Sequence, residues 1–180
     1  MELYMEPVTR QSQFWDDINA LALEAFPPEE YLAPSKLVEM TKGNVDFWAL
    51  SDNGLFVGFM VILTYKNMAY LFFLAIHHAL RSKGYGSLSI KTLKSKYPKK
   101  KLVVDFEMLD DHADNSEQRK KRRNFYLQNG YKETGFFVSY MGVDYEVFCM
   151  DDDFDPDDFK EMMKTIQVDG FDPKYFYKQI

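Results

Sequence analysis

A glycine-containing turn at residues 81–86 holds the residue types that most directly indicate chemistry in this sequence. Its six residues are Arg-Ser-Lys-Gly-Tyr-Gly, and they lie between an apolar segment and an amphipathic one. A tight turn that opens a helix presents successive backbone N–H groups and the positive end of the helix dipole, which bind phosphate oxygens. Gly84 and Gly86 permit close approach of the backbone, while Arg81 and Lys83 add positive charge. The sequence therefore predicts a phosphate-binding turn.

Other phosphate-binding motifs fit this segment less well. The P-loop pattern G-x-x-x-x-G-K-[ST] is absent, and the dinucleotide fingerprint G-x-G-x-x-G would need a third glycine where the chain has Ser89. A short Gly-x-Gly turn alone can also be a helix start with two incidental glycines. Its position, directly after a strand that is apolar on both faces and directly before a helix, favours phosphate binding.

Two carboxylates on a predicted strand, residues 101–109, are candidates for accepting a proton. Asp105 and Glu107 share one face of this strand in an otherwise apolar sheet. Burial of an unpaired carboxylate is costly and raises its pKa, so such residues are often functional. Glu107, nearer to the end of the strand, is the predicted general base, acting directly or through water. The alternative is that both carboxylates face solvent or pair with Lys99–Lys101.

Histidines and a basic helix are weaker candidates. His77 and His78 follow the apolar segment and have a pKa suited to proton transfer, although most loop histidines have no such role. Arg119–Arg123 is a run of five basic residues, but on one helix they spread around the circumference, which is typical of a solvated face. The narrower alternative is that one or two of them, with Lys83, contact a phosphate group.

The composition bounds the class of protein. The chain has 180 residues, 46% hydrophobic and 28% charged, in the range of one soluble globular domain. Nine of the 28 acidic residues lie in residues 151–180, and no concentrated basic surface for nucleic acid is evident. A single cysteine, Cys149, excludes an intramolecular disulfide, and no Cys/His spacing indicates zinc. We therefore expect no bound metal. Because the sequence has no apolar run with the character of a signal peptide or the length of a membrane span, we also expect a cytoplasmic protein with no membrane partner.

Hydrophobic periodicity and turn signals predict the helices and strands that position these residues. The Asp52-Asn53-Gly54 turn predicts an antiparallel hairpin, and the strand–helix–strand unit at residues 68–109 predicts two parallel neighbours. The predicted strands are residues 2–8, 45–51, 55–65, 68–76, 101–109, 131–140 and 144–150, and the predicted helices are residues 12–26, 34–42, 84–97 and 116–129.

Three helix ends carry sequence signals. Gly43 suits the left-handed position after the helix that ends at residue 42, and Gly130 suits the same position after Asn129. Asn115 and Gln118 predict a capping box at the start of the helix at residues 116–129.

Two segments, in the same order, resemble the GNAT superfamily of N-acetyltransferases. Residues 69–87 run from Ala-Tyr-Leu-Phe-Phe-Leu-Ala-Ile through His-His-Ala-Leu to Arg-Ser-Lys-Gly-Tyr-Gly-Ser, and resemble the family's core motif, [QR]-x-x-G-x-[GA]. Residues 123–131 resemble its later helix, which ends in a Phe-Tyr pair followed by Gly and an aromatic residue. Ser82 stands where the family often has Gly, and His78 or Ala79 where it often has Pro. Neither position needs a side chain for the phosphate contacts.

The resemblance implies an α/β fold of the GNAT type, a mixed six- to seven-stranded sheet flanked by helices, with acetyl-CoA as co-substrate. It implies that the backbone of Leu74 and Ile76 pairs with the pantetheine arm, and that an N–H near Ala75 or Ile76 polarises the acetyl carbonyl. It also implies that Tyr126 protonates the departing thiolate. The residues implied to contact the cofactor are Leu74, Ala75, Ile76, Arg81, Ser82, Lys83, Gly84, Tyr85, Gly86, Ser87 and Asn124.

In this family the loop after the first helix frequently lines the acceptor site, and here it contains Glu29, Glu30 and Tyr31. Carboxylates there would attract a cationic amine, although an acidic exposed turn is an equally good interpretation. We therefore expect an enzyme that transfers the acetyl group of acetyl-CoA to a primary amine of a small molecule or peptide, by direct attack in a ternary complex. The alternative is a non-catalytic acyl-CoA-binding sensor of the same fold, and the tyrosine at position 126 favours the enzyme.

The expected domain organisation is an acetyltransferase domain, residues 1–150, followed by an acidic and aromatic extension, residues 151–180. Phe154, Phe159 and Ile166 have roughly helical spacing within it, so we expect the extension to pack on the domain. The sequence leaves open whether it covers the acceptor site, makes a homodimer contact or caps the sheet.

Overall fold

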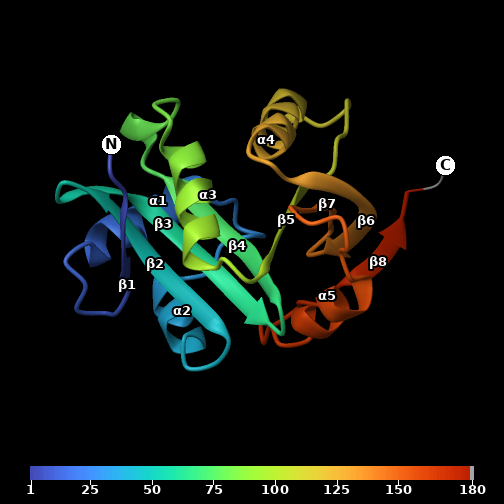
Figure 1. Cartoon of the computed structure of the whole chain (residues 1–180), viewed down its shortest axis with the longest axis horizontal. Helices are drawn as coiled ribbons and strands as arrows, with labels where there is room; N and C mark the ends of the chain where they lie inside the picture. Colours follow the sequence, from blue (N-terminus) through green and yellow to red (C-terminus); the bar gives the residue numbers. More distant parts are fainter. Residues whose placement is uncertain (179–180) are drawn as a thin grey trace. The chain divides into compact units, whose positions relative to one another are not determined.

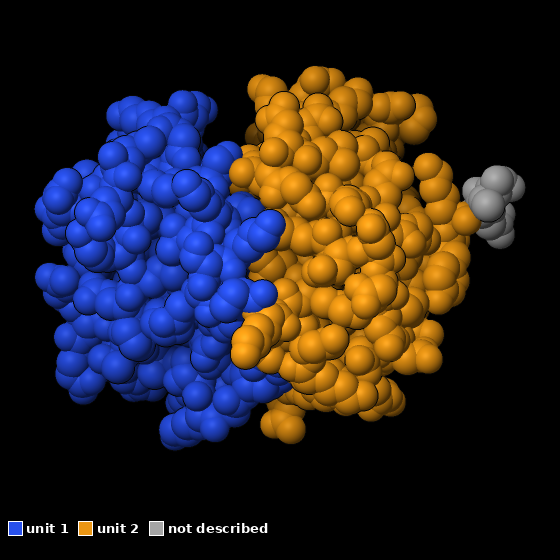
Figure 2. Space-filling model, in the orientation of Figure 1, with its two compact units in different colours: residues 1–64, 71–98 blue, residues 65–70, 99–180 orange. Residues whose placement is uncertain are grey.

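The computed structural model describes residues 1–178, which form two compact units (Figure 2). Unit 1 comprises residues 1–64 and 71–98, and unit 2 comprises residues 65–70 and the described residues from 99 onward. Each unit has its own buried core and is described by itself.

The strands follow the order β1-β2-β3-β4-β5-β7-β6-β8 in a mixed sheet flanked by helices (Figure 1). The predicted α/β architecture is confirmed, whereas the predicted number of six to seven strands is too low because residues 174–177 form an eighth. The strands are β1 (Tyr4–Pro7), β2 (Val45–Asp52), β3 (Leu55–Tyr65), β4 (Met68–Ile76), β5 (Lys101–Glu107), β6 (Lys132–Tyr140), β7 (Val143–Cys149) and β8 (Lys174–Tyr177).

In unit 1, β2 and β3 form the antiparallel hairpin that the sequence predicts. Its turn residues, Asn53 (φ 48°) and Gly54 (φ 79°), are both left-handed, as a two-residue type I′ turn requires. β1 pairs antiparallel with the other edge of β2. The register of β2 with β3 shifts between Leu50 and Ser51.

Two helices precede this hairpin, α1 (Trp15–Ala25) and α2 (Pro34–Met40). Phe26, the residue after α1, packs against Phe59 of β3 with ring centroids 6.2 Å apart. Phe47 of β2 contacts the same Phe59 ring at 5.7 Å. The face of the strands that carries Phe47 and Phe59 is therefore the face that α1 covers.

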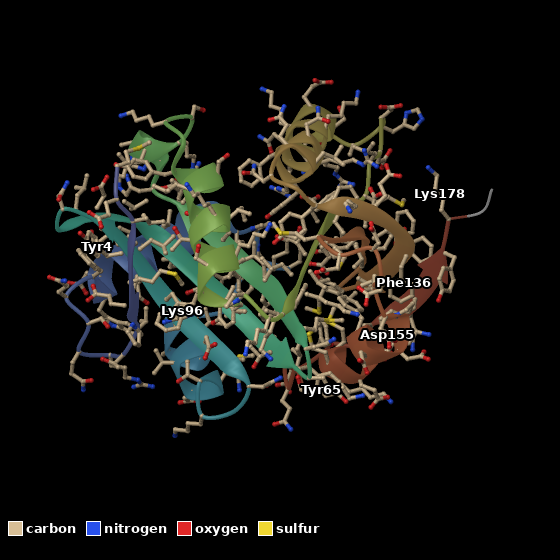
Figure 3. All side chains as sticks on the ribbon, in the orientation of Figure 1. Tyr4, Tyr65, Lys96, Phe136, Asp155 and Lys178 are labelled. Carbon is tan, nitrogen blue, oxygen red and sulfur yellow. The ribbon has the colours of Figure 1, made fainter. Side chains whose placement is uncertain are left out.

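Helix α3 (Tyr85–Lys96) covers the opposite face of the unit 1 strands. Side chains alternate along a strand, so Trp48 points away from the face of its neighbour Phe47. Trp48 donates its indole N–H to the hydroxyl of Tyr97, directly after α3, at 3.0 Å. Lys96, labelled in Figure 3, holds its ammonium 4.5 Å from the centroid of the same indole.

Helix α2 ends without the left-handed glycine that the sequence predicts. Gly43 is not among the residues with positive φ, so that prediction is wrong. The backbone N–H groups of residues 41–43 instead bond to carbonyls three residues earlier, at 3.1–3.2 Å. Such short-range bonds tighten the last turn and satisfy its carbonyls without a chain reversal.

Unit 2 is built on β5, β7, β6 and β8, which pair antiparallel in that order. Helix α4 (Ser116–Gln128) ends as predicted, with Gly130 in the left-handed conformation (φ 91°). The predicted capping box at its start is wrong, because Asn115 makes no capping bond. Its amide donates instead to both carboxylate oxygens of Glu107, at 3.2 and 3.3 Å.

The C-terminal segment adds helix α5 (Pro156–Met163) and strand β8 to unit 2. Asp155, labelled in Figure 3, caps α5 by accepting the backbone N–H groups of Asp157 and Asp158 at 2.9 and 3.2 Å. Phe159 of α5 is fully buried, and β8 pairs antiparallel with β6. The domain boundary at residue 150 stays a prediction.

Candidate active site

The glycine turn lies between β4 and α3 in unit 1. A 3-10 turn, His78–Leu80, follows β4, and then Ser82 (φ 61°) and Gly84 (φ 89°) adopt left-handed conformations. Only glycine adopts this region without strain, so Gly84 suits its position and Ser82 holds a less favourable one. These two reversals turn the chain from the end of the strand into the first turn of α3.

The first turn of α3 presents backbone N–H groups that no carbonyl of residues 1–178 accepts. Leu88 is the first helical residue that bonds back, to the carbonyl of Gly84 at 3.0 Å. Gly84 is the N-cap and supplies no side-chain acceptor. Among the described residues the N–H groups of Tyr85, Gly86 and Ser87 therefore lack acceptors, and they carry the positive end of the helix dipole. This arrangement fits a pyrophosphate, which offers many acceptor oxygens and negative charge.

Arg81 is held beside the strand end by two contacts. Its Nε donates to the carbonyl of Ile76 at 3.0 Å, and its Nη2 pairs with Glu24 of α1 at 2.9 Å. The other oxygen of Glu24 lies 3.2 Å from Nδ1 of His78, whose ring stacks on that of His77. Arg81 therefore braces the turn against α1, while Lys83 is exposed.

Tyr85 anchors the turn to the β2–β3 hairpin. Its hydroxyl donates to Oδ2 of Asp52 at 2.8 Å, and both side chains are buried. The bond to Asp52 raises the pKa of Tyr85, so its hydroxyl stays protonated and the donor is retained. Ser89, one turn further along α3, is fully buried and donates to the carbonyl of Tyr85 at 2.7 Å. Ser89 stands where a third glycine would complete a dinucleotide fingerprint.

The end of β4 lies very close to β3. A Cβ built on Gly58 would overlap the carbonyl oxygen of Ala75, so only glycine fits there. The C=O of Ala75 and the N–H of Ile76 belong to one trans peptide and point in opposite directions. Because the carbonyl faces Gly58 of β3, the Ile76 N–H is directed away from Gly58. The predicted donor to the acetyl carbonyl is an N–H near Ala75 or Ile76, and of these two the Ile76 N–H is the one directed away from β3.

The predicted acceptor residues lie in the loop between α1 and α2. Glu29 is exposed, and Glu30 and Tyr31 are half-buried. The backbone N–H groups of Glu30 and Tyr31 both donate to the carbonyl of Pro27 at 3.0 Å, which closes the loop into a turn.

Tyr126 lies in unit 2, in the last turns of α4. Its ring stacks on Phe106 of β5 with centroids 5.3 Å apart and meets Tyr131 edge-on at 5.4 Å. Burial raises the pKa of Tyr126 to about 12, partly offset by Arg122 and increased further by Asp105. The hydroxyl is therefore protonated at neutral pH, the form that a proton donor needs.

Glu107 ends β5 and is engaged by three donors. Its carboxylate pairs with Arg119 at 2.9 Å and with Arg122 at 3.0 Å, and it accepts the amide of Asn115. These contacts fasten α4 to the end of β5. Because both oxygens of Glu107 already pair with arginine side chains, this carboxylate has a structural role. Its predicted role as the general base stays a prediction. Asn124, on the same helix, is exposed.

Asp105, two residues before Glu107 on β5, has a different setting. Oδ1 accepts the hydroxyl of Tyr70 at 2.6 Å, and Oδ2 accepts the hydroxyl of Tyr140 at 3.0 Å. The sequence placed Asp105 on the face of Glu107 but gave no signal for its tyrosine partners, each of which lies 35 residues away along the chain.

The sequence-predicted residues divide between the units. Unit 1 holds the strand end at residues 74–76, the turn at residues 81–87 and the acceptor loop at residues 29–31, whereas unit 2 holds Glu107 and the α4 residues, Asn124 and Tyr126. Within the described residues, no three His, Cys, Asp or Glu side chains are grouped as metal ligands. No helix of residues 1–178 combines the length and apolar character needed to cross a bilayer.

Comparison with known families identifies the chain. A family model described as an acetyltransferase (GNAT) domain matches residues 43–133, slightly more than half of the sequence. The chain belongs to the GNAT acetyltransferase family. The match contains the glycine turn, the end of β4 and Tyr126, so the resemblance of both motifs to this family is confirmed. Acetyl transfer is the chemistry that this membership indicates.

Solved GNAT structures share the fold of this family member. A protein assigned to the GNAT family from Bacteroides thetaiotaomicron has 24% identity and a TM-score of 0.68, covering 88% of this chain and 92% of its own. A GNAT family acetyltransferase from Elizabethkingia anophelis, with acetyl-CoA bound, has 14% identity and a TM-score of 0.57, covering 83% of this chain and 97% of its own. The aminoglycoside 6'-N-acetyltransferase from Enterococcus faecium has 16% identity and a TM-score of 0.59, covering 81% of this chain and 95% of its own. No curated protein sequence matches this GNAT chain.

Proposed function

We propose that this protein is an N-acetyltransferase that transfers the acetyl group of acetyl-CoA to a primary amine by direct attack in a ternary complex. The observation that carries the proposal is the set of N–H groups at Tyr85, Gly86 and Ser87 that have no acceptor among residues 1–178, at the start of the helix that follows β4 and the glycine turn. The acetyltransferase of similar fold from Elizabethkingia anophelis has been solved with acetyl-CoA bound. The protein of similar fold from Enterococcus faecium is an aminoglycoside N-acetyltransferase, an enzyme that acetylates an amine.

The chain's own residues supply the contacts for the donor. The first turn of α3 binds the pyrophosphate through backbone N–H groups, and Lys83 adds the exposed positive charge nearby. The edge of β4 at Leu74 and Ile76 pairs with the amide groups of the pantetheine arm. The N–H of Ile76 donates to the acetyl oxygen, whose negative charge grows as the amine attacks.

Tyr126 assists the departing thiolate. The pKa of an ordinary thiol is about 8.5, well below the value of about 12 that burial gives Tyr126. Complete transfer of its proton to sulfur is therefore uphill, by about 5 kcal/mol for this difference. The hydroxyl contributes by donating a hydrogen bond to the thiolate, and the second proton lost by the amine nitrogen supplies the thiol hydrogen.

The proton balance of the reaction is simple. An alkylammonium loses one proton to solvent, its nitrogen lone pair forms the C–N bond, and the C–S bond breaks with its electron pair going to sulfur. The nitrogen then loses a second proton, and the thiolate gains one. Each turnover therefore releases one proton, which gives a second readout beside the free thiol.

A pair of measurements tests the proposal. In thermal unfolding, CoA or acetyl-CoA at about 100 times its Kd should add about 2.7 kcal/mol to the free energy of unfolding. An assay of free thiol with acetyl-CoA and a panel of primary amines then measures turnover. Stabilisation by neither ligand would refute the proposal, and stabilisation without turnover on any amine would favour the acyl-CoA sensor instead.

A further inference from the structure

Glu24 is a carboxylate in the last turn of α1, where the helix itself does not favour a negative charge. The negative end of the helix dipole lies there, so cations are stabilised at this end and anions are not. The last turn of α1 contains no basic residue. The partners of Glu24 come from the segment after β4 instead, because Oε1 lies 2.9 Å from Nη2 of Arg81 and Oε2 lies 3.2 Å from Nδ1 of His78. Glu24 is therefore directed at the glycine turn.

Arg81 is held along one edge of its guanidinium. Nε donates to the carbonyl of Ile76 at 3.0 Å, and Nη2 donates to Glu24 at 2.9 Å. These two nitrogens share one edge of the planar group. Within residues 1–178 only these two of its five N–H groups have an acceptor, which leaves both hydrogens of Nη1 and one of Nη2. The Nη1–Nη2 end is the fork that binds two phosphate oxygens at once.

The contact with Glu24 orders a side chain that packing does not hold. The side chains of Arg81 and Glu24 are 49% and 42% exposed. An ion pair this exposed contributes little to the stability of the fold. It still limits the rotation of the guanidinium about its single bond to the carbonyl of Ile76, because it adds a second anchor from another element. A side chain ordered in advance loses less entropy when it binds a ligand.

We propose that Glu24 is a positioning residue for the acetyl donor, which orients Arg81 so that its Nη1–Nη2 end binds the pyrophosphate of acetyl-CoA. The inference rests on the proposed function and adds to the donor site a residue of α1 that touches neither substrate. Its expected effect is opposite to that of charge alone. Loss of a negative charge beside an anion site would tighten anion binding, whereas loss of the anchor weakens it.

Calorimetric titration of the full chain with CoA tests the inference without any need for turnover. Glu24→Gln removes the charge and nearly keeps the shape, and it should raise the Kd for CoA by about 3- to 10-fold. Glu24→Asp keeps the charge but is too short to reach both partners, so its Kd should rise as well. The matched control is Glu39→Gln, because Glu39 of α2 forms an exposed pair with Arg10 in the same unit, at 3.5 Å. It should bind CoA like the wild type.

A double-mutant cycle with Arg81→Gln shows whether Glu24 acts through Arg81. Arg81→Gln alone should raise the Kd for CoA, and Glu24→Gln should add no further increase in that background. Pantetheine is the second probe, because it has the amide groups of the cofactor arm and no phosphate. Its Kd should be the same for the wild type and Glu24→Gln. Equal weakening of pantetheine and CoA would indicate a general distortion of the site and would overturn the inference.

The outcomes separate this inference from the proposed function. A Kd for CoA that is unchanged or lower in Glu24→Gln would overturn the inference alone, and so would a rise of the same size in the Arg81→Gln background. A wild-type protein that binds CoA but acetylates no amine would refute the proposed function alone, because the comparison of Kd values still decides the role of Glu24. A wild-type protein that does not bind CoA would overturn both.

Discussion

The carbonyl oxygen of Ala75 occupies the space that a side chain on Gly58 would need. This contact fixes the peptide between Ala75 and Ile76, whose N–H we assign to the acetyl oxygen. We expect Gly58→Ala to lower the free energy of unfolding by about 1–3 kcal/mol, because β3 and β4 must separate to admit the methyl group. Urea unfolding measures the loss.

Gly43→Ala is the control for that substitution. A Cβ on Gly43 would meet only the carbonyl of Met40, at 3.7 Å, and the backbone there is not left-handed. Its stability should therefore match the wild type or exceed it slightly. Equal effects of the two substitutions would contradict the packing argument.

Gly84→Ala should weaken donor binding more than it weakens the fold. At φ 89° an alanine is strained by about 1–2 kcal/mol, and the chain can relieve this strain by moving the first turn of α3. Gly130 has almost the same φ, 91°, and open space around it, but it lies after α4 in unit 2. Both alanine variants should lose similar stability in urea, and only Gly84→Ala should raise the Kd for CoA in calorimetry. A raised Kd in Gly130→Ala would argue against the turn as the anion site.

Tyr126→Phe should lower kcat by about 10- to 100-fold and leave the Kd for acetyl-CoA nearly unchanged, since only the hydroxyl is lost. Tyr131→Phe is its control, because Tyr131 packs on Tyr126 and its buried hydroxyl has no hydrogen-bond partner among residues 1–178. Removing that hydroxyl should leave turnover intact and maintain or raise stability. Steady-state thiol release compares the two, and an unchanged kcat in Tyr126→Phe would exclude the role.

The free energy of unfolding should decrease at high pH because the hydroxyl of Tyr126 ionises. Its pKa is raised from 10 in the unfolded chain to about 12 in the folded protein, so the unfolded state loses its proton first. The stabilisation is complete below pH 10 and is lost as the pH rises toward 12, by at most about 3 kcal/mol for two pKa units. Urea unfolding on either side of this window should show a larger loss for the wild type than for Tyr126→Phe. Identical losses would contradict the prediction.

Glu107→Gln distinguishes a structural carboxylate from a catalytic base. The amide cannot pair with Arg119 and Arg122, so unfolding should become easier by about 2 kcal/mol. We expect kcat to change by less than a few-fold, because the oxygens of Glu107 are already occupied in the fold. A fall of kcat by two or more orders of magnitude, with intact donor binding, would restore Glu107 as the base.

Most of the fold could be predicted because its signals are local. The Asp52-Asn53-Gly54 turn and the alternation of β2 and β3 need only neighbouring residues, and Gly130 ends α4 by its own conformational freedom. β8 could not be predicted in this way, since a four-residue strand at residues 174–177 depends on pairing with β6. The capping box failed for a related reason, because Asn115 bonds to Glu107 instead of to its own helix.

In the candidate site, too, the features with local sequence signals could be predicted, and those that depend on distant residues could not. The backbone donors of the turn follow from two glycines and a helix start, which the sequence displays directly. The partners of the charged residues do not, because they come from distant elements: Arg81 from the turn meets Glu24 of α1, and Asp105 of β5 meets Tyr70 and Tyr140. Sequence patterns place such residues on a face or in a loop, and only the folded chain selects their partners.

The pairing of Glu24 with Arg81 and His78 has an electrostatic consequence. The carboxylate compensates the positive charge of Arg81, so the turn shows an approaching anion less net charge than its two basic residues suggest. Long-range attraction then depends mainly on Lys83 and on the helix dipole, whose reach is about one turn. The affinity for acetyl-CoA would consequently depend on short-range contacts with the backbone of the turn. This affinity should therefore decrease only slightly as the salt concentration rises.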